Sequence, residues 1–222
     1  MKRVIMTGAS DGLGREFGKL CVTEGIEIVS LSRQKPDYPC VHIPTDLVDE
    51  NAIIAAAEIV KEKYAEFDAL VNCAGLISKQ KPNEITYDEM ERTMKVNSLA
   101  PIFLTSRLFD LIKKNGADVM NVGSTVGLKA YADQCVYGTS KWAIRGTTEN
   151  LRVEFAKTKC RAIQFNPGGM VTNFFKKYNG EYVTDPENWM KPADVAAIML
   201  YVLKLPKQVE VGEITIHRKP AQ

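Results

Sequence analysis

The chain has 222 residues, of which 45% are hydrophobic and 25% are charged, an ordinary composition for a globular protein. Its 29 basic and 27 acidic residues give a net charge of +2, so charge offers no argument for binding nucleic acid or an anionic membrane. No apolar run approaches the roughly 20 residues of a membrane-spanning helix, and Met1 to Met6 contains too short an apolar run for a signal peptide.

The N-terminal part predicts a strand, a glycine-rich turn, a helix over residues 15–24 and a second strand over residues 26–31. In such a unit the glycines let backbone N–H groups approach a pyrophosphate, and the helix N-terminus adds partial positive charge. A tight turn without a ligand is the alternative reading. The pattern predicts a dinucleotide site at Thr7, Gly8, Ser10, Asp11, Gly12, Leu13 and Gly14.

The second predicted strand ends at Ser32 and Arg33. A unit specific for NAD usually has Asp or Glu at this place to hold the ribose 2′-hydroxyl, whereas an arginine accommodates a 2′-phosphate. Ser32 and Arg33 therefore predict a site that prefers NADP(H) over NAD(H). The alternative is a solvated arginine at the start of a loop.

The remaining elements alternate between strand and helix. Residues 34–39 are polar, contain two prolines and are too few for a full helix, so a loop is expected before a third strand over residues 40–43. Asn97 and Pro101 are unfavourable inside the long helix predicted over residues 86–111, and a kink or a local widening is expected there. Further helices are predicted over residues 49–64, 137–157 and 193–203, and further strands over residues 67–71, 117–122, 160–165 and 213–217.

This alternation predicts an α/β fold, a Rossmann-type doubly wound parallel sheet of about seven strands with helices on both faces. We expect a single domain over residues 1–222, with no linker that would divide it. In such folds ligands bind at the carboxyl ends of the strands, where the unusual residues of this chain lie.

Tyr137 and Lys141 are four residues apart on a predicted helix, so their polar ends can converge. A neighbouring ammonium favours phenolate, so we expect Lys141 to lower the pKa of Tyr137 and to make it a proton donor near neutral pH. This pair alone is a weak signal, because the same spacing also occurs on ordinary surface helices.

Several further motifs, which follow one another along the chain, strengthen the case for the Tyr137–Lys141 pair. With these motifs the chain resembles the short-chain dehydrogenase/reductase family over nearly its whole length. The glycine turn Thr7-Gly8-x-x-x-Gly12-x-Gly14 is similar to the family's cofactor turn, and Asn72-Cys73-Ala74-Gly75 is similar to its Asn-Asn-Ala-Gly motif. Ser124 precedes Tyr137 by thirteen residues, a spacing that the family often shows. The resemblance implies a catalytic tetrad of Asn97, Ser124, Tyr137 and Lys141, and cofactor contacts at Asp46, Leu47, Asn72, Ala74, Gly75, Tyr137, Lys141, Pro167, Gly168 and Thr172.

The resemblance also implies hydride transfer between NADPH and a small-molecule carbonyl or alcohol, of the carbonyl reductase or 3-oxoacyl reductase type. A lid over residues 170–190 and assembly into a homodimer or homotetramer are further expectations. An NAD-dependent alcohol dehydrogenase and a non-catalytic dinucleotide sensor stay open as alternatives.

The five cysteines are odd in number and widely spaced, and only two histidines accompany them. No metal site is therefore expected. We expect the thiols to be reduced and the protein to be cytoplasmic.

Overall fold

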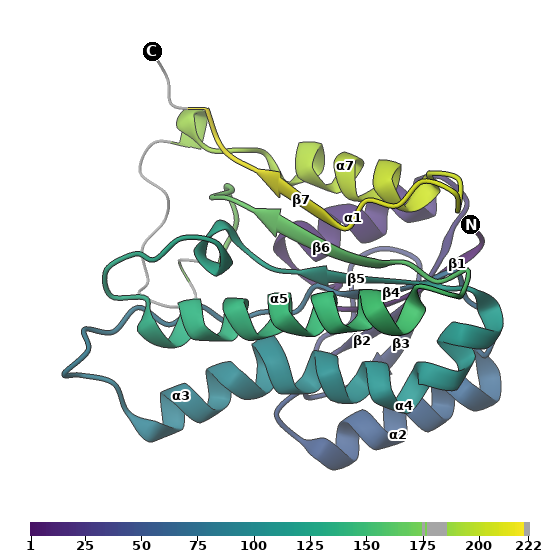
Figure 1. Cartoon of the computed structure of the whole chain (residues 1–222), viewed down its shortest axis with the longest axis horizontal. Coiled ribbons are helices and arrows are strands. Elements are labelled where there is room, and N and C mark those ends of the chain that lie inside the picture. The colour runs from purple at the N-terminus through teal and green to yellow at the C-terminus, as the bar shows by residue number, and fades with distance from the viewer. Residues whose placement is uncertain (175, 177–185, 220–222) are drawn as a thin grey trace.

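The computed structural model describes residues 1–174, 176 and 186–219 of the chain. Within them, seven strands form one parallel sheet in the order β3-β2-β1-β4-β5-β6-β7 (Figure 1). This result confirms the predicted Rossmann-type sheet. The strands are β1 (Arg3–Thr7), β2 (Glu27–Ser32), β3 (Val41–Pro44), β4 (Ala69–Asn72), β5 (Asp118–Val122), β6 (Ala162–Pro167) and β7 (Glu213–Ile216).

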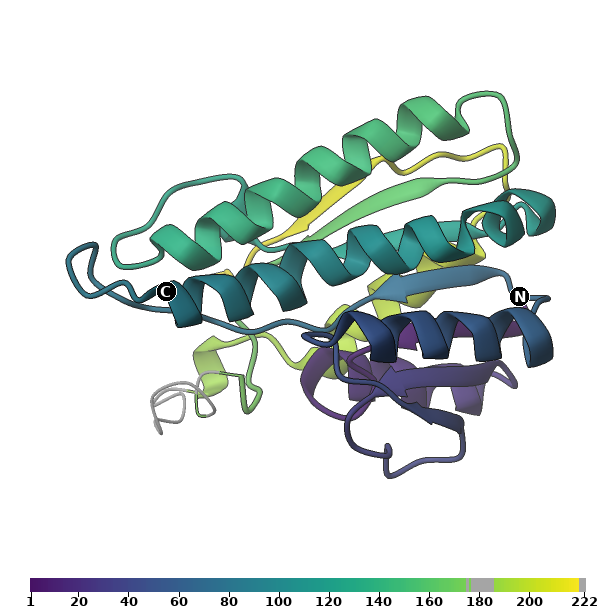
Figure 2. The ribbon, with the colours of Figure 1, turned by 90° about the horizontal axis from the view of Figure 1, so that it is seen from below.

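Helices cover both faces of the sheet, so consecutive residues of its inner strands are buried. The helices α2 (Glu50–Lys63), α4 (Ala100–Asn115) and α5 (Cys135–Phe155) lie side by side on one face, as Figure 2 shows. On the opposite face α1 (Gly12–Thr23) packs against α7 (Pro192–Lys204). Each face has its own hydrophobic core, so the sheet is buried on both sides.

The predicted long helix divides into three parts. It begins with α3 (Tyr87–Met94), widens into a π-helical turn over Lys95–Leu99 and continues as α4. Asn97 lies in the π-helical turn, so the widening that was predicted there is confirmed. Such turns often occur at functional sites because they rotate a side chain out of the regular helical row.

The connection between β2 and β3 contains no helix, as predicted, and joins two parallel strands through residues 33–40. The chain builds the sheet outwards from β1 in one direction through β2 and β3, and then in the other direction from β4. The carboxyl ends of β1 and β4 therefore border the crevice at which the strand order reverses.

No helix in the part of the chain that the structure describes is long and apolar enough to cross a membrane.

Candidate active site

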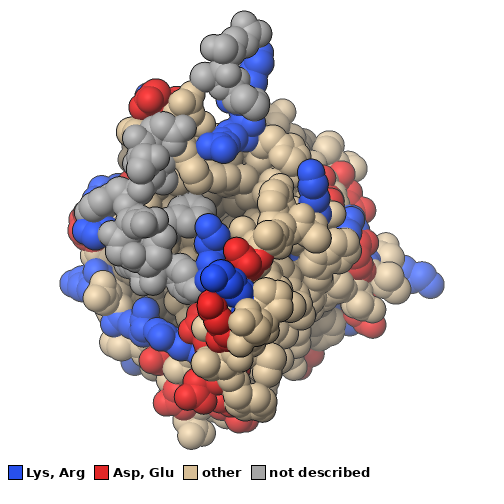
Figure 3. Space-filling view, turned by 90° about the vertical axis from the view of Figure 1, so that its left-hand side faces the viewer, with Lys and Arg blue, Asp and Glu red and all other residues tan. Residues whose placement is uncertain are grey.

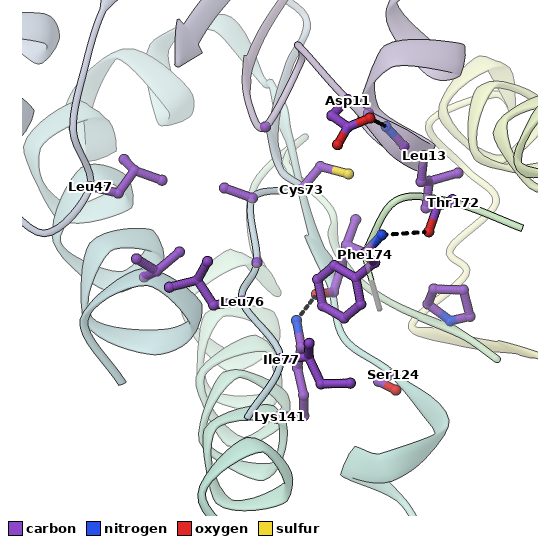
Figure 4. A pocket seen from close by; sticks show the side chains of 18 of the residues that line it. Asp11, Leu13, Leu47, Cys73, Leu76, Ile77, Ser124, Lys141, Thr172 and Phe174 are labelled. Atoms are coloured by element: carbon purple, nitrogen blue, oxygen red, sulfur yellow. Dashed lines mark hydrogen bonds between the residues drawn. The ribbon is translucent and has the colours of Figure 1, made fainter. Parts of the chain in front are cut away.

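A cavity of about 540 Å³ opens at the carboxyl ends of the strands. Figure 3 looks onto this end of the molecule, where Lys and Arg side chains lie around a hollow, and Figure 4 shows the interior. Most of the residues predicted from sequence line this cavity, although they come from distant parts of the chain. They are Gly8, Ser10, Asp11, Gly12, Leu13, Gly14, Ser32, Arg33, Asp46, Leu47, Ala74, Gly75, Ser124, Tyr137, Lys141, Pro167, Gly168 and Thr172.

The glycine-rich turn is packed so closely that side chains are excluded from it. A Cβ atom on Gly8, whose φ is +71°, would lie 2.6 Å from the backbone nitrogen of Ala74. A Cβ atom on Gly14 would lie 2.1 Å from the carbonyl oxygen of Gly8. Gly12, with φ of +51°, faces the cavity and meets only the side chain of Thr172, at 3.5 Å.

This turn leads directly into α1, whose first helical residue is Gly12, three residues earlier than predicted. Asp11 is the N-cap, and its Oδ1 accepts a hydrogen bond of 2.8 Å from the Gly12 N–H. The bare backbone and the helix N-terminus facing a cavity of this size fit the pyrophosphate of a dinucleotide.

Thr7 and Asn72 do not line the cavity but lie beneath it. The Oγ1 atom of Thr7 accepts hydrogen bonds of 3.2 Å from the N–H groups of both Cys73 and Ala74. The Nδ2 atom of Asn72 donates to Oδ1 of Asn121 at 2.8 Å. These two residues therefore hold the loop after β4 against β1 and β5, and the neighbouring Ala74 and Gly75 line the cavity.

At the end of β2 the cavity is bordered by Arg33, which is exposed. Among the described residues its guanidinium has no hydrogen-bond or ion-pair partner. Ser32 instead is buried and donates to the carbonyl oxygen of Gln34 at 2.8 Å. Across the cavity rim, Oδ1 of Asp46 accepts from the Val48 N–H at 3.2 Å. Arg33 is therefore a cation available to an anionic ligand.

Ser124, Tyr137 and Lys141 lie together at the inner end of the cavity, and each is less than 9% exposed. The Nζ atom of Lys141 donates a hydrogen bond of 2.9 Å to the carbonyl oxygen of Val122 and lies 5.8 Å from the centroid of the Tyr137 ring. The three side chains come from the end of β5 and from two successive turns of α5, as their spacing predicted.

The pKa of Tyr137 differs from the prediction. Burial raises the pKa of Tyr137 to about 12, although a hydrogen bond with Ser124 acts in the opposite direction. Burial also lowers the pKa of Lys141 from 10.5 to about 8. The expectation that Lys141 lowers the pKa of Tyr137 is thus wrong, because burial disfavours the charged phenolate and raises this pKa.

Asn97 is 2% exposed and does not line the cavity. Its Oδ1 accepts from the Leu76 N–H at 2.7 Å, and its Nδ2 donates to the Leu76 carbonyl at 2.8 Å and to Oγ of Ser140 at 2.9 Å. A Cβ atom on Gly75 would lie 3.6 Å from this Oδ1 and 3.7 Å from Nζ of Lys141. By these hydrogen bonds to the Leu76 backbone, Asn97 holds the loop after β4 close to Lys141.

An apolar wall surrounds Tyr137, and two of its residues, Ile77 and Val126, were not predicted from sequence. Ile77 and Val126 are buried against the Tyr137 ring, and the Phe174 ring lies 6.1 Å from it, centroid to centroid. Ile77 and Val126 belong to no motif, so no sequence signal marks them, whereas Phe174 belongs to the segment predicted as a lid. Of the lid predicted over residues 170–190, residues 175 and 177–185 lie outside the described part of the chain. Other cavity residues missed from sequence include Cys73, Leu76, Arg92, Val96 and Gln134.

Comparison with known proteins shows the family of this chain. A family model described as short chain dehydrogenase matches residues 2–182. An uncharacterised oxidoreductase of Staphylococcus aureus (strain USA300) is 26% identical over 226 residues, which is 97% of this chain and 96% of that protein. One from Staphylococcus saprophyticus is 25% identical over 229 residues, with the same coverage.

Solved structures show the same fold. A serine dehydrogenase complexed with NADP⁺ has a TM-score of 0.88 at 22% identity, covering 96% of this chain and 94% of that one. A 3-ketoacyl-(acyl-carrier-protein) reductase from Brucella melitensis, complexed with NADH, has a TM-score of 0.86 at 23% identity, covering 97% and 96%. Because the family model spans most of the sequence and the fold agrees, the chain belongs to the short-chain dehydrogenase family, oxidoreductases that act on CH–OH groups with a nicotinamide dinucleotide.

Proposed function

We propose that this protein is an NADPH-dependent reductase that transfers a hydride between the nicotinamide and the carbonyl or alcohol carbon of a small molecule. One observation carries the proposal: Ser124, Tyr137 and Lys141 share a single cavity with the glycine-rich turn. A protein that only senses dinucleotides needs the turn but not the three polar side chains at the far end of the cavity.

Each residue of this group has a distinct role. The phenol of Tyr137 keeps its proton at neutral pH, since its pKa is about 12, and can give that proton to the oxygen of the reduced substrate. The Ser124 hydroxyl donates a hydrogen bond to the same oxygen and stabilises its developing charge. Lys141, protonated at neutral pH because its pKa is about 8, stabilises the phenolate left behind. The bound dinucleotide supplies the hydride.

Asn97 has a positioning role. The resemblance implied a place for it in the catalytic tetrad, whereas its three hydrogen bonds to Leu76 and Ser140 support an indirect role. By fixing the Leu76 backbone, Asn97 places Gly75 beside Lys141, where the cofactor is expected to lie.

The preference for NADPH rests on Arg33. Its guanidinium is exposed at the cavity rim and has no partner within residues 1–174, 176 and 186–219, so it is available to a 2′-phosphate. An NAD-dependent alcohol dehydrogenase is the second candidate, and it requires that Arg33 contribute nothing to nucleotide affinity.

The surroundings of Tyr137 support an apolar carbonyl substrate of the carbonyl reductase or 3-oxoacyl reductase type. Ile77, Val126 and Phe174 place hydrocarbon on the walls next to the reacting oxygen. A substrate with an apolar group beside its carbonyl would bury that group against these side chains.

The outer face of the molecule supports a homodimer or homotetramer. Leu99 and Ile102 near the start of α4, and Trp142 and Val153 on α5, are large apolar side chains between 40% and 76% exposed. Two copies that pair through these adjacent helices would cover them. The assembled enzyme is proposed to act in the cytoplasm.

Substitution of the phenol tests the catalytic part of the proposal. A Tyr137→Phe variant should reduce NADPH-dependent turnover of a carbonyl panel by about 10²–10⁴-fold, which is the usual contribution of general acid catalysis. NADPH binding, measured by fluorescence titration, should change by less than about threefold because the ring stays in place. The exposed Tyr131→Phe is the matched control. Activity of Tyr137→Phe within a few-fold of the wild type would remove Tyr137 from the mechanism.

Substitution of the rim cation tests the cofactor preference. Arg33→Asp should weaken NADPH binding by about 10–150-fold, because a hydrogen bond to a charged group contributes about 1.5–3 kcal/mol. Binding of NADH, measured on the same variant, serves as the internal control and should not weaken. A wild type that prefers NADH would show that this interpretation of Arg33 is wrong.

A further inference from the structure

Tyr38 lies in the short connection between β2 and β3, and its side chain is 7% exposed. The residue belongs to the hydrophobic core between the sheet and α1, in the same cluster of buried residues as Ala9, Leu13 and Phe17. Its hydroxyl donates a hydrogen bond of 3.0 Å to the carbonyl oxygen of Ala9. Ala9 belongs to the glycine-rich turn, so this bond links a loop at the edge of the sheet to the predicted cofactor site.

Helix α1 is shaped to admit this side chain. A Cβ atom on Gly18 would lie 1.8 Å from the hydroxyl oxygen of Tyr38 and 2.3 Å from Cζ. A glycine inside a helix costs about 1 kcal/mol relative to alanine, so its presence calls for a packing reason. The glycine at position 18 provides the space in which the Tyr38 hydroxyl reaches the turn.

The neighbouring residue ties the same loop to the outside of α1. The Asp37 carboxylate accepts hydrogen bonds from Nε of Arg15 at 2.9 Å and from its Nη2 at 2.5 Å. The loop is therefore held at two adjacent residues, one buried and one exposed. Burial also raises the pKa of Tyr38, which keeps its phenol a neutral hydrogen-bond donor.

The bond to Ala9 has a consequence on the other side of the turn. The Ala9 carbonyl and the Ser10 N–H belong to one planar trans peptide, so the two groups point in opposite directions. The carbonyl is held on the core side by Tyr38, and Ser10 lines the cavity. No protein acceptor for the Ser10 N–H occurs in the described part of the chain.

We propose that Tyr38 is a positioning residue that fixes the Ala9–Ser10 peptide with its N–H turned toward the cavity, where it donates to the phosphate-bearing part of the dinucleotide. The inference rests on the dinucleotide site of the proposed function. A backbone N–H held in place binds an oxygen of a phosphate without first losing conformational freedom. Tyr38 thus acts through Ser10 and does not touch the ligand itself.

Binding of ADP-ribose, followed by titration calorimetry, tests this role. ADP-ribose carries the adenosine and the pyrophosphate but neither the 2′-phosphate nor the nicotinamide, so the result is independent of what Arg33 and Tyr137 do. A Tyr38→Phe variant keeps the ring over Gly18 and removes only the hydroxyl. Its Kd for ADP-ribose and for NADPH should both rise about threefold to tenfold, with kcat at saturating NADPH unchanged.

Two control variants separate positioning from stability. Tyr201→Phe removes a hydroxyl from a side chain that is 67% exposed on α7 and should bind as the wild type does. Val60→Ala truncates a fully buried residue of α2, on the opposite face of the sheet. It should lower the melting temperature and leave both Kd values unchanged. A Tyr38→Phe variant that loses stability but binds ADP-ribose with wild-type affinity would overturn the proposal.

Discussion

Replacing the buried lysine should make the protein more stable while removing its activity. Lys141 is 4% exposed, and burial lowers its pKa from 10.5 to about 8. At about 1.36 kcal/mol per pKa unit, this difference corresponds to about 3 kcal/mol of destabilisation when the side chain is charged. The hydrogen bond from Nζ to the Val122 carbonyl offsets about 1 kcal/mol of this destabilisation. A Lys141→Met variant should therefore gain about 2 kcal/mol at pH 7.

The stability difference between Lys141→Met and the wild type should become smaller as the pH rises. Between about pH 8 and 10.5 the unfolded chain still holds a proton on Lys141 that the folded protein has released. The free energy of unfolding of the wild type consequently rises with pH across this window. The advantage of Lys141→Met should be largest below pH 8 and should fade as the pH approaches 10.5. Tyr137 is present in both proteins, so its titration cancels to a first approximation.

Urea denaturation of the nucleotide-free proteins, followed by circular dichroism at pH 7, 8, 9 and 10, measures this difference. The melting temperature at pH 7 should rise by about 4–8 °C, as about 2 kcal/mol implies for a chain of this size. Lys114→Met, an exposed substitution on α4, should stay within about 0.5 kcal/mol of the wild type at every pH. The reasoning is refuted if Lys141→Met is no more stable than the wild type at pH 7, or if its advantage is the same at pH 7 and pH 10.

Two further substitutions test the packing that supports the site. Asp118 is 2% exposed and accepts two hydrogen bonds from the buried Arg161, so Asp118→Asn should destabilise the protein by about 3–5 kcal/mol in urea denaturation. Because Asp118 begins β5 at the end of the sheet away from the cavity, NADPH affinity should not change, and a large loss of affinity would contradict this assignment. Gly14→Ala would press a methyl group onto the Gly8 carbonyl and should cost about 1–3 kcal/mol and weaken NADPH binding. A Cβ atom on Gly146 would meet no atom of a neighbouring segment within 4 Å, so Gly146→Ala should instead stabilise α5 by up to about 1 kcal/mol. If the protein tolerated both changes equally, the glycine turn would have space for a methyl group.

The order and type of the elements could be predicted from sequence because they depend on local patterns. Alternating strands and helices were enough to predict the parallel sheet. The short polar stretch with two prolines was enough to exclude a helix between β2 and β3. Asn97 and Pro101, both unfavourable in a regular helix, marked the place where the structure has a π-helical turn. The predicted start of α1 was less accurate, because Asp11 caps this helix inside the glycine turn.

The candidate site was predictable where its residues recur at fixed spacing on one element. Tyr137 and Lys141 share a helix face, and Ser124 lies two residues after the preceding strand β5, so their convergence follows from the topology. The shifts of their pKa values could not be predicted in the same way, because a pKa depends on how much water surrounds the group. Thr7 and Asn72 were placed in the motif correctly, but only the structure locates them beneath the cavity.

The sequence by itself determined the fold class, the positions of the glycine turn and the spacing of the polar residues around Tyr137, since all three are local properties of the chain. The tertiary structure decided which side chains surround these motifs. Tyr38 carries no motif, yet the path of residues 33–40 brings it over Gly18 and onto Ala9, 29 residues earlier in the chain. Burial decided the directions in which the pKa values of Tyr137 and Lys141 shift, because packing between distant segments removes the water around them.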